Sequence, residues 1–333
     1  MTAKTHVLSL FLLLSLGSTR LAAQAKIPVW IDTDPSLEQG VDDCFALIQA
    51  FHSPELEIRG VSAVFGNAPQ AETWRTASEI VRNFGPAGLK AYKGATSSDD
   101  LGRETDASIA LARSLQQGPL NILAIGPVTN IATVLRLHPG LAKNIVQIIA
   151  VAGRRPGQRF AYGSDQAPSF QDFNFELDSA GFQLLLDSKV RITLAPWEIS
   201  SKVWLRAEDV HQLENGGSAS KYLVQPSLNW LVWWRKNMGV DGFNPFDTLA
   251  VGYLTSPSLI HCRKAGVRIE YAPDDTAPAE TAKTKPYLLA SFEPAPSRTL
   301  LYCSEAAPQF KNDLMARLLS HPEKKESHVT DRR

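Results

Sequence analysis

The sequence predicts a single α/β domain with a Rossmann-like, mostly parallel sheet and helices on both of its faces. Short apolar runs alternate with amphipathic helical patterns from residue 28 to residue 195, which is typical of parallel strands joined by crossover helices. The chain has 333 residues, enough for one large domain of this class after an N-terminal segment is removed. Ligands of such folds gather beyond the carboxyl ends of the strands, so we expect the site there.

The individual elements follow from the spacing of their apolar residues. Runs of apolar side chains predict strands at residues 28–31, 56–65, 121–125, 145–151 and 191–195. Apolar residues at helical spacing predict a helix that ends near residue 51 and further helices at residues 71–83, 107–117, 130–137 and 179–187.

Residues 1–25 have the features of a cleavable export signal. Lys4 gives a positive start, residues 7–16 form an apolar core too short to span a bilayer comfortably, and residues 23–25, Ala-Gln-Ala, form a small-x-small cleavage site. We therefore expect an exported protein, periplasmic or secreted, with no stable membrane span after processing. Residues 26–320 are expected to form the domain, and residues 321–333 a charged, disordered tail.

Composition restricts the class of partner. Lys and Arg number 34 and Asp and Glu number 34, so the net charge is zero, and no basic block predicts a nucleic-acid surface. The expected partner is a small molecule. Three cysteines do not make a disulfide framework, although Cys262 and Cys303 are able to pair in an oxidising compartment, and Cys44 is expected to be a small buried residue.

Four aspartates lie between the first predicted strand and the helix that follows: Asp32, Asp34, Asp42 and Asp43. Carboxylates so close together repel one another unless a cation neutralises them, water solvates them or some remain protonated. Hard oxygen ligands favour calcium or magnesium. The alternative is a solvated loop whose aspartates cap the helix. Four acids directly after a buried strand favour the metal site.

Three families have an acidic stretch of this kind. An EF-hand loop from Asp32 would need Gly at its sixth position and Glu at its twelfth, where this chain has Leu37 and Asp43. A phosphatase of the haloacid dehalogenase type would use residues 32–36, Asp-Thr-Asp-Pro-Ser, as its nucleophile motif. The inosine-uridine preferring nucleoside hydrolases begin with a strand, Asp-x-Asp-Pro-Gly-x-Asp-Asp and a helix. Residues 32–35, Asp-Thr-Asp-Pro, and 42–47, Asp-Asp-Cys-Phe-Ala-Leu, resemble that signature.

The resemblance to the nucleoside hydrolases continues in the family's order from about residue 27 to residue 319. The similar segments are residues 65–67, Phe-Gly-Asn; residues 126–130, Gly-Pro-Val-Thr-Asn; residues 172–174, Asp-Phe-Asn, with a downstream Asp178; and residues 244–247, Asn-Pro-Phe-Asp. The phosphatase family needs a downstream Lys and a late acidic pair, whereas the late candidate in this chain is a lone Asp247.

The resemblance implies a set of residue roles. Calcium would be held by Asp34, Asp43, Asp247 and the carbonyl of Thr129, with Asp34 accepting the proton of the attacking water. The residues that would hold the ribose hydroxyls are Asp42, Asn67, Asp172 and Asn174. Asp32 would support this set by orienting a neighbour. No organic cofactor is implied, and the family is commonly dimeric or tetrameric, so we expect a homodimer or homotetramer.

The chain also departs from the family pattern. The loop at residues 36–41 is longer, Phe246 occupies the position of a His that assists the leaving base, and residues 92–106 lack a His-bearing loop. The candidates to replace these His residues are Glu198, Arg235, Tyr162, Trp197, Trp233 and Trp234.

We therefore expect calcium-dependent hydrolysis of the N-glycosidic bond of ribonucleosides, giving ribose and free base. Cleavage of that bond develops positive charge on the ribose and negative charge on the base, and the acidic set can stabilise the former. A non-catalytic ribose-binding or nucleoside-binding protein stays open because fold does not guarantee activity. A phosphatase is the third possibility.

Overall fold

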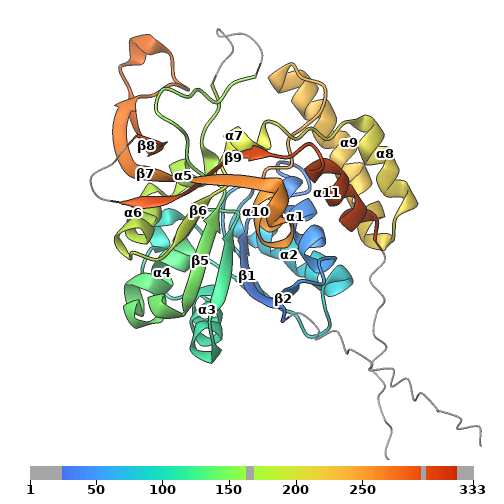
Figure 1. Ribbon diagram of the computed structural model, residues 1–333, viewed down its shortest axis with the longest axis horizontal. Helices are drawn as coiled ribbons and strands as arrows, with labels where there is room; N and C mark the ends of the chain where they lie inside the picture. The colour runs from blue at the N-terminus through green and yellow to red at the C-terminus, as the bar shows by residue number, and fades with distance from the viewer. Residues whose placement is uncertain (1–24, 163–168, 294–297, 321–333) are drawn as a thin grey trace, which may run out of the picture.

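The computed structural model describes residues 25–162, 169–293 and 298–320. The expected signal segment, apart from its last residue, and the expected tail lie outside these residues. The described chain forms one sheet in the strand order β3-β2-β1-β4-β5-β6-β9-β7-β8, with helices packed around it (Figure 1). The single α/β domain is therefore confirmed.

The strands are β1 (Ile27–Thr33), β2 (Leu56–Ala63), β3 (Ala91–Lys93), β4 (Leu120–Ala124), β5 (Ile145–Ala150), β6 (Ile192–Leu194), β7 (Ile260–Pro273), β8 (Thr284–Ser291) and β9 (Thr299–Ala306). The helices are α1 (Asp42–Phe51), α2 (Gln70–Phe84), α3 (Asp106–Gln117), α4 (Thr129–Leu137), α5 (Phe173–Leu177), α6 (Ser179–Asp187), α7 (Trp197–Ser200), α8 (Ala207–Gln212), α9 (Ser218–Met238), α10 (Thr248–Thr255) and α11 (Phe310–Leu319).

The sheet is parallel through β1 to β6 and β9, and β7 alone runs antiparallel to its neighbours β8 and β9. Every strand predicted from an apolar run is present within a few residues of its expected bounds. The three-residue strand β3 and the long strands β7 to β9 were not predicted. In β7 buried and exposed side chains are mixed along 14 residues, so that strand has no continuous apolar run to indicate it.

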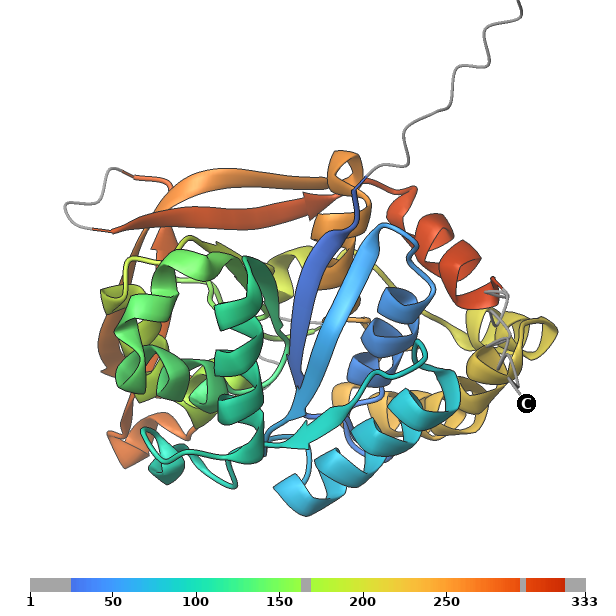
Figure 2. The same ribbon diagram turned by 90° about the horizontal axis from the view of Figure 1, so that it is seen from below.

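Helices cover both faces of the sheet, as β1 illustrates. Val29 and Ile31 are fully buried on the face that packs against α1, α2, α10 and α11, whereas Trp30 is buried among residues of α3, α4 and α6 on the other face. Figure 2 places β1 and β2 between these two groups of helices. Burial of each such side chain stabilises the fold by about 1.5–3 kcal/mol.

The register brings the carboxyl ends of the central strands to one edge. Thr33 of β1 pairs with Ala63 of β2, and Asp32 pairs with Ala124 of β4, which in turn pairs with Ala150 of β5. Loops that follow these strands therefore start side by side, although they are far apart in sequence. This edge is where the candidate site lies.

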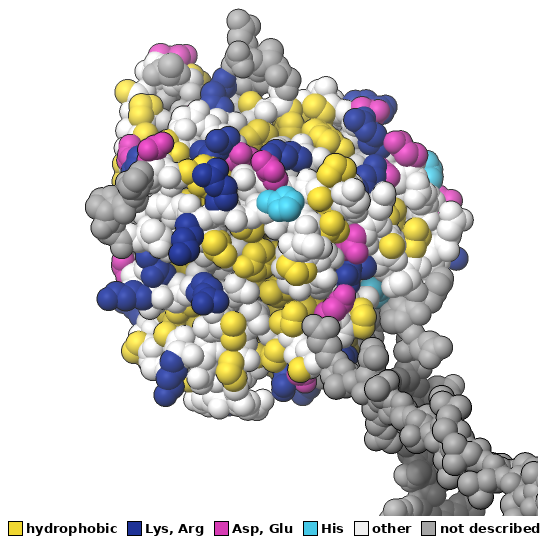
Figure 3. Space-filling view, viewed as in Figure 1, with side chains coloured by type: hydrophobic (Ala, Val, Ile, Leu, Met, Phe, Trp, Pro, Cys, Tyr) yellow, Lys and Arg dark blue, Asp and Glu magenta, His cyan; other side chains and the backbone are white. Residues whose placement is uncertain are grey.

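The surface agrees with a small-molecule partner. On the face seen in Figure 3, basic side chains are spread among acidic and hydrophobic ones. No helix in the described part of the chain is long and apolar enough to span a bilayer. Cys262 of β7 and Cys303 of β9 form a disulfide, which settles a pairing that the sequence left open, and Cys44 is buried with a free thiol, as expected.

Candidate active site

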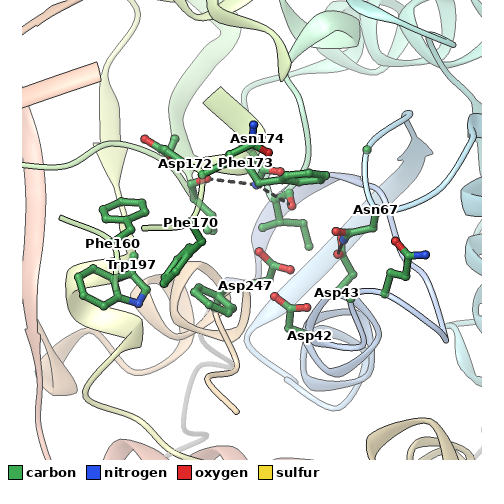
Figure 4. A pocket seen from close by; sticks show the side chains of 18 of the residues that line it. Asp42, Asp43, Asn67, Phe160, Phe170, Asp172, Phe173, Asn174, Trp197 and Asp247 are labelled. Carbon is green, nitrogen blue, oxygen red and sulfur yellow. Dashed lines mark hydrogen bonds between the residues drawn. The ribbon is translucent and has the colours of Figure 1, made fainter. Parts of the chain in front are cut away.

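A cavity of about 440 Å³ opens at the carboxyl edge of the sheet. It is lined by segments that follow β1, β2, β4 and β5 and by parts of α7, α9 and the start of α10. Six of the residues expected to hold the metal or the ribose line it: Asp42, Asp43, Asn67, Asp172, Asn174 and Asp247. Figure 4 shows the carboxyl groups of Asp42, Asp43 and Asp247 close together, with aromatic rings on the opposite side of the pocket.

Asp34 is fully buried at the base of this acidic group, outside the cavity lining. Its Oδ2 accepts the backbone N–H of Asn67 at 2.7 Å. A Cβ added at Gly66 would lie 1.9 Å from that oxygen, and one added at Gly126 would lie 2.7 Å from Oδ1. Two glycines therefore leave just enough room for the carboxylate. Its Oδ1 is buried and has no hydrogen-bond partner.

Asp43 is held in place by residues at the end of β1 and after β2. Its Oδ1 accepts the hydroxyl of Thr33 and the backbone N–H of Asp34, the latter at 3.0 Å. Its Oδ2 accepts the amide of Asn67 at 2.9 Å. Asn67 therefore positions both acids as well as lining the pocket, and its side-chain oxygen is the atom available to a ligand.

Asp247 precedes α10 but does not cap it, because its side chain accepts no hydrogen bond from the helix N-terminus. It lies instead with Asp42 and Asp43, and one carboxyl oxygen of each lies within 4.8 Å of the others. These three acids differ from the expected calcium ligands, because Asp42 is one of them and Asp34 lies beside the group and not in it. The side chain of Asp247 therefore does not cap the helix, which was the alternative interpretation of this residue.

The acids of this group have pKa values above the ordinary range. Burial is the main cause, and it raises the pKa of Asp42 to about 6 and that of Asp43 to about 8. Burial and then the negative charge of Asp43 raise the pKa of Asp34 and of Asp247 well above 3.8. Buried carboxylates that repel one another, with one oxygen unpartnered, fit a hard divalent cation.

Two further predicted residues support the site from behind. Thr129 begins α4 after β4, and its hydroxyl donates to Asp178 at 2.6 Å. Its side chain is therefore occupied, which leaves the backbone carbonyl as its group for a metal. Asp32 accepts hydrogen bonds from Ser62 and from Asn130, the latter at 2.8 Å, so it joins β1 to β2 and to the start of α4.

Asp172 and Asn174 follow β5 and reach the pocket from the start of α5. Asp172 accepts the backbone N–H of Gly153 at 2.7 Å, and burial raises its pKa to about 7 although the Arg154 charge lowers it. The amide nitrogen of Asn174 donates to the carbonyls of Ile125 at 3.2 Å and Val151 at 3.1 Å. Its amide oxygen then remains available to accept from a ligand hydroxyl.

The opposite wall is aromatic. The candidates Tyr162, Trp197, Trp233 and Trp234 all line the pocket, together with Phe246. Tyr162 contacts Trp197 and Trp234 with ring centroids 5.6 and 5.2 Å apart. The candidates Glu198 and Arg235 do not line it, since Glu198 pairs with Arg155 at 2.8 Å and Arg235 pairs with Asp241 on the surface.

The sequence analysis missed several lining residues. Phe160, Phe170, Phe173 and Trp230 complete the aromatic wall. No spacing in the sequence marks them, because they come from a loop, from the start of α5 and from α9, which meet only in the fold. Gln39 and Gly40 of the long 36–41 loop also line the pocket. A Cβ at Gly40 would lie 2.4 Å from the amide of Asn67, so glycine there is required by close packing.

A buried charge cluster behind the pocket was missed too. Arg154 pairs with Asp275 at 2.7 Å, and Lys285 pairs with Asp275 at 2.9 Å and with Glu176 at 2.8 Å. The Arg154 guanidinium also lies 4.0 Å from the centroid of Phe160. Glu176 accepts the backbone N–H of Asp172 at 2.9 Å, so the cluster joins the β7–β8 hairpin to two parts of the pocket wall.

Comparison with known proteins agrees with this geometry. Residues 29–286 match the family model of the inosine-uridine preferring nucleoside hydrolases. The pyrimidine-specific ribonucleoside hydrolase RihA of Citrobacter koseri is 24% identical over 273 residues, which cover 73% of this chain and 84% of the relative. A probable uridine nucleosidase 2 of Oryza sativa subsp. japonica is 24% identical over 272 residues, which cover 73% of this chain and 78% of the relative.

Solved structures of the same kind share the fold. A purine-preferring ribonucleoside hydrolase from Gardnerella vaginalis superposes with a TM-score of 0.71 at 20% identity, over 87% of this chain and 98% of that one. A plant nucleoside hydrolase superposes with a TM-score of 0.69 at 20% identity, over 89% of this chain and 99% of that one.

The fold and the acidic pocket thus define a glycosidic hydrolase. The chain belongs to the inosine-uridine preferring nucleoside hydrolase family, and it hydrolyses N-glycosidic bonds of nucleosides. The phosphatase alternative is wrong.

Proposed function

We propose that this protein is a calcium-dependent hydrolase that converts ribonucleosides to ribose and free base. The observation that carries the proposal is the buried acidic group at one end of a pocket of about 440 Å³. Asp34 supports it most directly, because a buried carboxylate oxygen without any partner costs free energy unless a cation meets it.

The donors fit calcium. Asp34, Asp43, Asp247 and the Thr129 carbonyl are all hard oxygen ligands that the protein itself supplies, and calcium accepts six to eight such oxygens in flexible geometry. Magnesium usually keeps several waters and takes fewer protein ligands. Calcium bound by these carboxylates supplies a site for the attacking water and lowers the pKa of that water.

The residues of the chain have separate roles in the proposed reaction. Asp34 accepts the proton of the attacking water; Gly66 and Gly126 leave the room that its carboxylate needs, and the backbone N–H of Asn67 holds it in place. The ribose hydroxyls are held by Asp42, Asn67, Asp172 and Asn174, which line the pocket. Negative carboxylates beside the sugar stabilise the positive charge that develops on the ribose ring.

Ribose release from a panel of purine and pyrimidine nucleosides, with and without a calcium chelator, tests the proposal. Release should depend on calcium, and Asp34→Asn should lower kcat at least a hundred-fold, about the contribution of one general base, while circular dichroism stays unchanged. Asp99→Asn is the matched control, since Asp99 is exposed and outside the pocket. Calcium binding without release from any nucleoside would favour a binding protein instead.

We also propose export and self-association. Export is supported by residues 1–25 and by the Cys262–Cys303 disulfide, which suits an oxidising compartment. Mass spectrometry of the mature protein should find its first residue near Lys26. A homodimer or homotetramer rests on the family resemblance, and light scattering that gives the mass of a monomer would refute it.

A further inference from the structure

Apart from the aspartates assigned to the metal and the ribose, the described residues that line the pocket include no acid able to protonate a departing base. Tyr162 is the one phenol among the lining residues, and its hydroxyl already donates to Asn244 and accepts the indole N–H of Trp197 at 2.7 Å. Burial also raises its pKa above the ordinary value. The tyrosine is therefore held in internal hydrogen bonds and is a poor proton donor.

Histidine is missing from the described lining as well. The described histidines are His52, His138, His211 and His261, and none of them lines the pocket. Phe246, directly before Asp247, presents an apolar ring to the pocket instead. A neutral base that leaves without receiving a proton must leave as an anion.

The aromatic wall disfavours such an anion. Trp197, Trp230, Trp233 and Trp234 line the pocket with Phe246, and Trp230 stacks on Trp233 with centroids 4.6 Å apart. The faces of aromatic rings carry negative electrostatic potential, so they attract cations and repel anions.

The charges of the pocket point the same way. Its acidic and basic lining residues in the described chain are four aspartates, namely Asp42, Asp43, Asp172 and Asp247, without a lysine or arginine. The nearby Arg154 is only 2% exposed and is neutralised by Asp275 and Glu176. Even with a divalent cation in place, this pocket favours a positively charged ligand.

We propose that the preferred substrates are ribonucleosides whose glycosidic nitrogen is quaternary, such as N-ribosylpyridinium compounds, with the aromatic wall as the subsite for the cationic base. The inference rests on the hydrolase function proposed above.

The chemistry balances without a leaving-group acid. The water oxygen bonds to C1′ while the bond from C1′ to the ring nitrogen breaks, and the electron pair of that bond cancels the positive charge of the nitrogen. The proton of the water goes to Asp34. Products are ribose and a neutral base. One positive charge is present throughout and moves from the aromatic wall toward the carboxylates, so it is stabilised at both ends.

The test compares two ligands that differ by charge. N-ribosylnicotinamide is a permanent cation, and its 1,4-dihydro form is neutral and of similar shape. Calorimetric titration of the Asp34→Asn variant with each ligand removes turnover from the measurement. We expect the cation to bind at least about ten-fold more tightly, the upper part of the range for cation–π contacts. Equal binding, or tighter binding of the neutral form, would overturn the proposal.

Aromatic variants in the same background locate the effect. Trp233 is 37% exposed, so Trp233→Leu should fold, and it should weaken binding of the cation about five-fold and of the neutral ligand less than two-fold. Trp233→Phe keeps a ring and should restore most of the preference. Trp197→Leu tests a second position of the aromatic wall in the same way. If neither leucine variant weakens cation binding selectively, the aromatic wall is not the subsite.

Turnover separates this inference from the proposed function. With Asp34 intact, Phe246→His should raise kcat/KM for uridine and inosine at least about ten-fold by supplying an acid, while N-ribosylnicotinamide gains little. Calcium-dependent release from uridine and inosine equal to that from the cation would overturn the inference and keep the hydrolase. No release from any of the three compounds would overturn the hydrolase function itself.

Discussion

Gly66→Ala perturbs the position of one carboxylate without removing it. The new Cβ would lie 1.9 Å from Oδ2 of Asp34, where ordinary contacts begin at 3.4 Å. The oxygen, or the loop that carries residue 66, must therefore move by about 1.5 Å. Gly66 also has φ near +155°, a conformation that costs a residue with a side chain about 1–3 kcal/mol.

The expected result is a folded, less stable protein with little activity. A displacement of about 1 Å at a catalytic group lowers the rate about a hundred-fold, so kcat for ribose release should fall by that factor or more. Calcium affinity should fall as well, because Asp34 is a proposed ligand, and the shift of Tm with added calcium measures this. Urea denaturation gives the backbone contribution separately.

Gly140→Ala is the matched control, because Gly140 is exposed and a Cβ there meets nothing within 4 Å. It should leave kcat and calcium affinity unchanged. Wild-type kcat in Gly66→Ala, measured well below its Tm, would refute the assignment of Asp34 as the base. A loss of kcat with full calcium affinity would leave Asp34 as the base and remove it from the metal ligands.

Two further outcomes follow from the acidic group. With calcium removed by a chelator, the free energy of unfolding should decrease as pH rises from about 5 to about 8. The raised pKa values of Asp42 and Asp43 mean that the folded protein binds more protons than the unfolded chain between these pH values. Each group contributes up to about 1.4 kcal/mol per pH unit. Thermal unfolding at several pH values measures this dependence, and saturating calcium, which replaces those protons, should remove it. A Tm that does not change with pH in the presence of the chelator would contradict the reasoning. Thr129→Val removes the hydroxyl contact to Asp178 and should reduce the free energy of unfolding by about 1–3 kcal/mol, yet calcium titration should find nearly unchanged affinity, since the proposed ligand is the backbone carbonyl. A folded Thr129→Val protein that no longer binds calcium would show that the side chain is the ligand.

The sequence by itself determined five of the parallel strands, though not β3 or β9. Buried parallel strands are continuous apolar runs, and this local signal marked β1, β2, β4, β5 and β6. Asp34 and Asp43 could be singled out because they lie in one short acidic stretch after a strand, whereas the later residues, Asp247 among them, were indicated by the family resemblance; Asp247 follows α9 and not a strand. The strand β7 has no clear local signal, because buried and exposed side chains are mixed along it, whereas β8 and β9 contain short apolar runs at residues 287–290 and 300–303 that were not assigned as strands.

Only the tertiary structure decided how the far side of the pocket is built. Trp197 of α7, Trp233 of α9 and Phe246 before α10 meet there, and no local pattern distinguishes a ring that lines a pocket from one that fills a core. The same holds for Gly66 and Gly126, which matter because Asp34 lies against both. Local sequence specifies the element that a residue joins, whereas contacts between distant elements decide what that residue faces.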